Sequence, residues 1–284
     1  MTVQSARLIE GAEQMLLYPR TGLVVMSVTS ASPAVRAVTE PRADDDGELD
    51  TTSRFGGRAV AVELMAIETP AGFCEELGTW MHPGRRPYLE VIDDEWAQTR
   101  RIMLRSDQWG GPIDADDSPD IRRIPAQWRA PDGIWEASQE LTLTVSADVP
   151  SSVGVSAPLS APIALTPTSA SGALQITNVG GSPSHFRALL YGPCSAPRLI
   201  NDLTGEEIAF TSELVLAAGE YIEVDTRNKS ARLLSSVNAS RLRYIDFAAN
   251  TWWQIQRGAQ QIRYAPTAPT AGSQAVISYR PAWL

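Results

Sequence analysis

The second half of the chain consists of short segments in which apolar and polar residues alternate, separated by turn residues. Alternation with a period of two is typical of a strand with one buried and one solvated face, and a helix cannot bury such a pattern on one side. The segments lie at residues 174–177, 186–191, 208–210, 221–224, 231–234, 253–255, 262–264 and 275–279. Their even spacing predicts a β-sandwich or jelly roll.

The first half of the chain contains the one segment with clear helical periodicity. Phe73, Leu77 and Trp80 are spaced by four and three residues, as on one face of a helix, and Pro83 and Gly84 follow them. We therefore expect a helix over residues 71–81. Strands are expected at residues 59–67, 88–92, 101–104 and 141–145, and a loop over 109–135. The predicted fold class is mainly β, with one helix in the N-terminal part.

The chain is long enough for two domains. Its 284 residues compare with about 100 to 200 for a typical domain. A tract of Ser, Ala, Pro and Val at residues 147–172 has almost no charge and marks a boundary or an extended crossing segment. We expect domains at residues 1–150 and 151–284. The sequence leaves open whether the last strand, near 275–279, returns to the first domain.

Charge and composition exclude several classes of protein. The net charge of -9 argues against specific nucleic-acid binding, which depends on clusters of Lys and Arg that displace counterions from phosphates. No apolar run approaches the roughly 18 residues that a membrane span needs, so no membrane insertion is expected. Cys74 and Cys194 lie far apart with no CxxC spacing, so neither a disulfide framework nor a zinc site is predicted.

Residues that could carry out catalysis are few. The chain has two histidines, His82 at the end of the expected helix and His185 after a turn. Neither a metalloprotease HExxH, a phosphate-binding loop, a dinucleotide-binding GxGxxG nor a GxSxG nucleophile motif is present. The sequence predicts no catalytic residue, no cofactor and no metal site.

Residues 37–53 form an acidic segment with little that could enter a core. Asp44, Asp45, Asp46 and Gly47 invite comparison with a calcium loop, but an EF-hand with this glycine at its sixth position would begin at Arg42, which cannot be a ligand. The segment is expected to be an exposed loop or the tip of a long hairpin. The paired glycines that follow, at 56–57, predict a bulge or a close backbone approach.

Eight tryptophans could provide stacking surfaces for sugars. Trp252 and Trp253 are adjacent, so in a strand one points inward and the other outward. One of the two is expected in the core. The other is a candidate contact to a glycan or to another subunit.

The order of motifs in the last third of the chain resembles that of a known family. Leu203-Thr204-Gly205 is followed by residues 220–226, 253–258 and 261–264, and the chain ends on 279–284. This order resembles the C-terminal half of the distal tail proteins of long-tailed bacteriophages. In the first half, Gly56-Gly57-Arg58 before a strand, the expected helix and the strands near 88–104 extend the resemblance.

The resemblance implies a structural virion protein rather than an enzyme. Members of that family have an N-terminal barrel-like or sandwich-like domain that closes into a six-fold ring, and a C-terminal galectin-like β-sandwich. The implied role is a homo-hexameric hub at the phage tail tip, assembled in the host cytoplasm, with a central channel for DNA. The implied partners are the tail tube protein, the tape measure protein, tail-tip or baseplate proteins, and receptor-binding proteins or host glycans. Asp44 to Gly47 would then suit contact between rings, and the acidic balance would suit the channel.

Two alternatives from other classes stay open at the level of sequence. The first is a carbohydrate-binding module that uses Trp252 or Trp253 on the host surface. The second is a β-sandwich glycoside hydrolase, with two carboxylates drawn from Asp44 to Asp46 or from the cluster Asp114, Asp116, Asp117 and Asp120.

Overall fold

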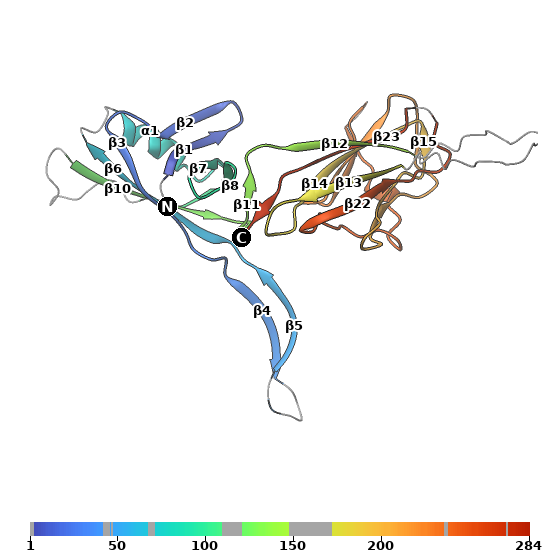
Figure 1. The fold of residues 1–284 in the computed structure, drawn as a ribbon, viewed down its shortest axis with the longest axis horizontal. Coiled ribbons are helices and arrows are strands. Elements are labelled where there is room, and N and C mark those ends of the chain that lie inside the picture. Colours follow the sequence, from blue (N-terminus) through green and yellow to red (C-terminus); the bar gives the residue numbers. More distant parts are fainter. Residues whose placement is uncertain are drawn as a thin grey trace, which may run out of the picture. The chain divides into compact units, whose positions relative to one another are not determined.

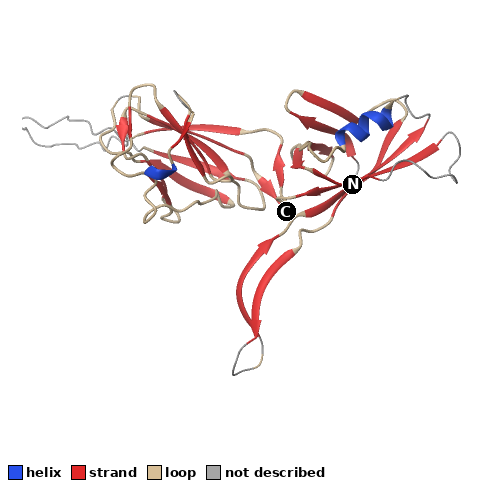
Figure 2. Ribbon diagram, turned by 180° about the vertical axis from the view of Figure 1, so that it is seen from behind, coloured by secondary structure: helices blue, strands red, loops and turns tan. Residues whose placement is uncertain are grey.

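The computed structural model describes residues 3–41, 46, 48–67, 72–109, 121–147, 172–235, 238–270 and 272–284. The chain divides into two compact units. The first comprises Met1–Gln139 with Ala282–Leu284, and the second comprises Glu140–Pro281. Figure 1 labels the elements of both units, and Figure 2 shows that strands dominate each of them.

The first unit contains two open antiparallel sheets rather than a closed barrel. One sheet has the order β2-β1-β7-β8-β11-β24 and the other has the order β3-β6-β10-β9. The strands of the first sheet are β1 (Val3–Glu10), β2 (Glu13–Tyr18), β7 (Tyr88–Asp93), β8 (Arg100–Met103), β11 (Trp135–Ala137) and β24 (Ala282–Trp283). Those of the second are β3 (Leu23–Ser30), β6 (Arg58–Ile67), β9 (Arg105–Trp109) and β10 (Ile121–Ala130). Buried side chains from both sheets form one hydrophobic core.

The expected helix is confirmed as α1 (Phe73–Trp80). Its buried residues are Phe73, Leu77 and Trp80, as their spacing predicts, and all three join the core of the first unit. Gly72 precedes the helix with a φ of 79°, a left-handed conformation that glycine adopts without a steric penalty. Within the described parts of the chain, no helix is long and apolar enough to cross a membrane.

The prediction of a loop over residues 109–135 is wrong. β10 runs through its centre and pairs with β6 along its whole length, from Ile121 opposite Ile67 to Ala130 opposite Arg58. Pro125 hides this strand in the sequence, because proline is rare in central strands. The proline is tolerated because pairing with β9 begins only at the next residue, Ala126.

The acidic segment forms a hairpin, in agreement with the hairpin alternative of the sequence analysis. Among the described strands, β4 (Val35–Pro41) and β5 (Glu48–Phe55) pair only with each other. Figure 1 shows them leading away from β3 and β6. At the base, the expected close approach is present: a Cβ on Gly57 would lie 2.9 Å from the carbonyl oxygen of Ala130.

The second unit is a β-sandwich. Its two main sheets have the orders β12-β23-β14-β19-β20-β21 and β13-β22-β16-β17, with a further pair β15-β18. The strands are β12 (Leu141–Ser146), β13 (Ala173–Asn178), β14 (Phe186–Tyr191), β15 (Cys194–Ser195), β16 (Arg198–Asn201), β17 (Glu207–Ala209), β18 (Val215–Leu216), β19 (Tyr221–Asp225), β20 (Ser230–Leu233), β21 (Ala239–Ser240), β22 (Gly258–Tyr264) and β23 (Gln274–Tyr279). The described part of this unit also contains a 3-10 turn, η1 (Leu242–Tyr244). Inward-facing residues of both sheets share one core.

The chain passes between units earlier than the sequence suggests. β12 was expected in the first domain, but it pairs with β23 from Leu141 opposite Tyr279 onward, so it belongs to the second unit. β23 therefore stays in the second unit, and only the last three residues rejoin the first, where β24 pairs with β11. Most of the expected crossing segment, residues 148–171, lies outside the described residues.

Candidate functional site

The sheet β3-β6-β10-β9 ends in two unpaired edges. Among the described residues, β3 pairs only with β6 and β9 only with β10. β3 contains no charged residue and no proline, the features that commonly protect an edge against further pairing. At a register shift between Val25 and Ser27, the side chain of Met26 is 53% exposed. The edge at β3 can therefore accept a strand from another chain, whereas β9 carries the charged residues Arg105 and Asp107.

A cavity of about 770 Å³ lies beside β3 within the first unit. Nearly the whole strand, from Val24 to Ser30, forms one wall. The remaining lining residues come from β1, β2, β6, β7, β8, β11 and the segments next to them: Val3, Tyr18, Arg58, Val91, Asp93, Trp96, Arg100, Trp135 and Leu284. Apolar and aromatic side chains thus surround two guanidinium groups and one carboxylate.

Arg58 is the most unusual residue of this cavity. It occupies an inward-facing position of β6 together with Val60 and Val62, and only 5% of its surface is exposed. Its Nη1 donates to the Ser30 hydroxyl at 3.0 Å, and the Trp135 indole donates to the same oxygen at 3.4 Å. Within the part of the chain that the structure describes, its Nε and Nη2 have no acceptor. Burial lowers the pKa of the Arg58 guanidinium from its ordinary value, so the site disfavours this charge as long as nothing pairs with it.

Arg100 lies between two indole rings at the same cavity. Its guanidinium carbon is 4.5 Å from the ring centre of Trp96 and 4.3 Å from that of Trp283. Burial lowers the pKa of Arg100, and the charge of Asp93 opposes that shift. The stack explains why β24 is held at the end of its sheet, because Trp283 contributes one side of it.

The face of the four-stranded sheet opposite this core carries arginines. Arg105 on β9 lies directly opposite Arg129 on β10, and Arg123 follows on the same exposed face. None of the three takes part in an ion pair with a described residue. Like charges opposite each other are unfavourable unless an anion faces them. The half-buried Glu63 is the acidic residue described on this face.

The two groups of residues singled out in the sequence have different outcomes. Asp44, Asp45 and Gly47 lie outside the described residues, and Asp46 is an exposed residue between β4 and β5. Trp253 is 2% exposed and belongs to the core of the second unit, where its ring centre lies 4.5 Å from that of Phe186. Trp252 is half-buried and packs against the same core. The expected strand at 253–255 is wrong, since only an isolated bridge joins Ile255 to Ser184.

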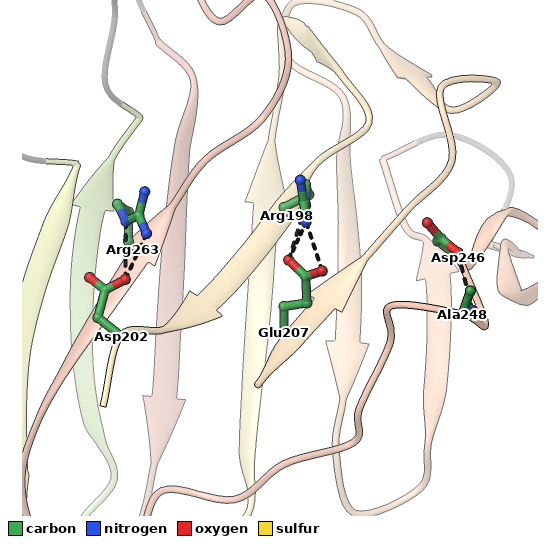
Figure 3. Close-up of polar contacts among 6 residues, drawn as sticks. All are labelled: Arg198, Asp202, Glu207, Asp246, Ala248 and Arg263. Carbon is green, nitrogen blue, oxygen red and sulfur yellow. Dashed lines mark hydrogen bonds and ion pairs between the residues drawn. The ribbon is translucent and has the colours of Figure 1, made fainter. Parts of the chain in front are cut away.

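The second unit presents charged side chains that are already paired with each other. Figure 3 shows Arg198 facing Glu207 and Arg263 facing Asp202, with Nη2–carboxylate distances of 2.7 and 2.8 Å. In the same view, the Ala248 amide donates to Asp246 at 3.1 Å and closes a turn. A nearby groove of about 470 Å³ is lined by Gln175, Asp202, Leu203, Ala259, Gln260 and Gln261. This groove has no aromatic side chain on which a sugar ring could stack.

The His82 and Cys194 side chains are held in local contacts. His82 accepts a hydrogen bond from the Gly84 amide at 3.1 Å, next to the end of α1. The Cys194 thiol lies 3.3 Å from the Tyr264 hydroxyl in the core, and burial raises the pKa of both groups. A raised pKa leaves the thiol protonated and unreactive at neutral pH. No cluster of His, Cys, Asp or Glu among these residues is placed to hold a metal ion.

No family model and no curated protein matches the sequence, so the similar proteins are those found by comparing structures. The crystal structure of the SPP1 Dit (gp 19.1) protein, described as a paradigm of the hub adsorption apparatus in phages that infect Gram-positive hosts, matches 98% of this chain and 99% of its own. The TM-score is 0.64 at 11% identity. The chain has the fold of the phage Dit proteins. A chain of the phage P2 baseplate in its activated, calcium-bound conformation also resembles it, with a TM-score of 0.51, 10% identity and coverage of 99% of this chain and 98% of that chain.

The Dit-like fold confirms the resemblance inferred from the last third of the chain. The features that the sequence analysis missed are the open edges of β3 and β9 and the unpaired Arg58. Arg58 carried one usable signal. It stands in phase with Val60, Val62 and Leu64 in an alternating run, which places a charge on the buried face of the strand.

Proposed function

We propose that the chain is a ring-forming structural hub of a phage tail, which joins the tail tube to the tail-tip or baseplate proteins. The observation that carries this proposal is the pair of open edges on the four-stranded sheet of the first unit. Pairing β9 of one copy with β3 of the next is a head-to-tail contact, and such contacts form a closed ring when the rotation between copies closes. The Dit-like fold and the tail-hub and baseplate neighbours support this reading.

The strand directions favour such closure. The sheet is antiparallel throughout and has an even number of strands, so β9 of one copy runs antiparallel to β3 of the next. The alternation then continues around the ring without a break. Closure would also remove the exposed edges, which otherwise invite aggregation. We propose a ring of six copies, the number implied by the family resemblance.

The arginine-bearing face would line the channel of this ring. We expected an acidic channel from the net charge of the chain, but Arg105, Arg123 and Arg129 outnumber the one described acidic residue, Glu63, on this face. Repeated in every copy, these side chains would meet the phosphates of DNA without reading its sequence. The hairpin β4–β5 is proposed to contact the adjacent tube ring, and the second unit is proposed to face the receptor-binding proteins.

The mass of the purified protein in solution, with electron microscopy of the same sample, tests the ring. We expect six copies around a central hole.

Val28→Pro should abolish the ring and leave the chain folded. The Ala31 amide donates to the Ala59 carbonyl and so points toward β6. Because backbone amides alternate in direction along a strand, the Val28 amide points away from β6. Thr29→Pro is the matched control: it removes an amide that points toward β6 and should destabilise the chain itself. A wild-type monomer at every concentration would refute the proposal.

Carbohydrate binding stays a second candidate for the second unit. The stacking platform required by that reading would have to be Trp252, because Trp253 is buried. Saturable glycan binding that is lost in Trp252→Ala and retained in a variant of the ring edge would support it. The absence of binding to host cell-wall glycans would leave the hub function unaffected.

A further inference from the structure

The cavity beside β3 contains an incomplete charge pair. Arg58 and Arg100 bring two positive charges to its wall, and Asp93 brings one negative charge. Burial lowers the pKa of Arg100, and the charge of Asp93 opposes this shift; an oxygen of Asp93 also accepts a hydrogen bond from the Glu95 amide at 2.9 Å. The guanidinium of Arg58, whose residue is only 5% exposed, therefore keeps two nitrogens, Nε and Nη2, without an acceptor among the described residues. Such a group requires a carboxylate, which none of the residues that the structure describes supplies.

The open edge of β3 indicates where that carboxylate would come from. Seven consecutive residues of this edge strand line the cavity, from Val24 to Ser30, so a strand added to β3 would also reach the cavity. The strand that the proposed ring adds at this edge is β9 of the neighbouring copy. β9 carries one acidic residue, Asp107, which is exposed and has no ion pair with a described residue.

The register of the sheet places Asp107 next to the row that contains Ser30, whose hydroxyl Arg58 reaches from the neighbouring strand. Ser30 lies opposite Val60, Val60 opposite Trp128, and Trp128 opposite Ser106, so these four residues form one row across the sheet. Continued into the next copy, the row brings the neighbour's Ser106 beside Ser30, whose hydroxyl accepts from Arg58. Asp107 is the unpaired residue at the register shift beside Ser106. Closure into a ring requires some stagger between strands, and a small stagger toward Ala31 brings Asp107 opposite Ser30.

We propose that Arg58 receives the Asp107 carboxylate of a neighbouring copy, so that ring closure completes a buried ion pair at each interface. The inference rests on the proposed ring and names the contact that locks it. It also gives the unpaired guanidinium a role: the charge disfavours the isolated chain and favours the closed ring.

Two variants and their combination test the pair. In Arg58→Met and in Asp107→Asn, the concentration at which the ring half-dissociates should rise at least about tenfold. Each change leaves the other member of the ion pair buried in the interface without a partner. The ring of the double variant should half-dissociate at no higher concentration than the ring of Arg58→Met, because the two changes remove the same interaction. Glu63→Gln, which changes a charge on the opposite face of the same sheet, is the matched control and should assemble as the wild type does.

A second readout separates pairing from a structural role. In dilute solution, where the chain is monomeric, Arg58→Met should raise the midpoint of urea unfolding, because it removes an unpaired buried charge. Asp107→Asn should leave that midpoint unchanged. A lower midpoint for Arg58→Met, or wild-type assembly by either single variant, would overturn the proposed pair and leave the ring intact. A wild-type chain that never forms rings would overturn both.

Discussion

The ring centre of Trp253 lies 4.5 Å from the ring centre of Phe186, inside the sandwich of the second unit. Phe186 is the first residue of β14, a central strand of the six-stranded sheet. Trp253 therefore packs the irregular segment before β22 against the middle of the sandwich. The tryptophan pair therefore divides into a core residue and a half-buried neighbour, Trp252.

This division predicts unequal effects of truncation. Trp253→Ala should lower the free energy of unfolding by about 3–5 kcal/mol, the usual cost of removing a buried tryptophan. Trp252→Ala should cost clearly less, because part of its surface is already in solvent. Urea unfolding followed by circular dichroism measures both. Equal losses would mean that Trp252 is as much a core residue as Trp253.

Two glycines of the first unit predict opposite responses to the same change. In Gly57→Ala the new methyl group would lie 2.9 Å from the Ala130 carbonyl oxygen, so β6 and β10 must separate and stability should fall by about 1–3 kcal/mol. Gly78 lies within α1, and a Cβ there meets nothing within 4 Å. Gly78→Ala should therefore raise stability by about 0.5–1 kcal/mol. Thermal unfolding of the two variants would contradict this account if their shifts had the same sign.

Local patterns in the sequence predicted the elements that local physics determines. The spacing of Phe73, Leu77 and Trp80 predicted α1, and alternation over Phe186–Tyr191 predicted β14 with both of its ends. Such segments need only a buried face. They do not depend on which partner covers it.

The sequence could not reveal features that depend on distant partners. β12 belongs to the second unit because Leu141 meets Tyr279, and nothing near Leu141 specifies that pairing. β10 was missed because Pro125 lies in its middle and two of its inward residues, Ala126 and Ala130, are small. The unpaired state of Arg58 is likewise visible only once its surroundings are assembled.

Burial of Cys194 predicts a loss of stability at alkaline pH. Burial raises the pKa of its thiol, so the folded chain keeps this proton to a higher pH than the unfolded chain does. The free energy of unfolding should therefore be level below the ordinary thiol pKa of about 8.5 and should fall as pH rises above it. Urea unfolding between about pH 7 and 9.5 should show a shallower decline in Cys194→Ala. Cys74, which is half-buried, is the control, and an equally shallow decline in Cys74→Ala would refute the assignment.

The hairpin β4–β5 should be dispensable for folding and required for contact between rings. The Gly56 amide donates to the Ala34 carbonyl at 2.7 Å, and Val35 lies opposite Phe55, so the two ends of the hairpin already meet at its base. Removal of residues 36–54 and closure of the gap with Asn-Gly, a dipeptide suited to a tight turn, should leave the melting temperature of the chain within a few degrees of the wild type.

The shortened chain should still form rings, because β3 and β9 are untouched, but these rings should no longer associate with the tail tube protein. Co-sedimentation of the two proteins measures this association. Undiminished association would show that the hairpin makes no contact between rings, whereas loss of the rings themselves would place its role within a single ring.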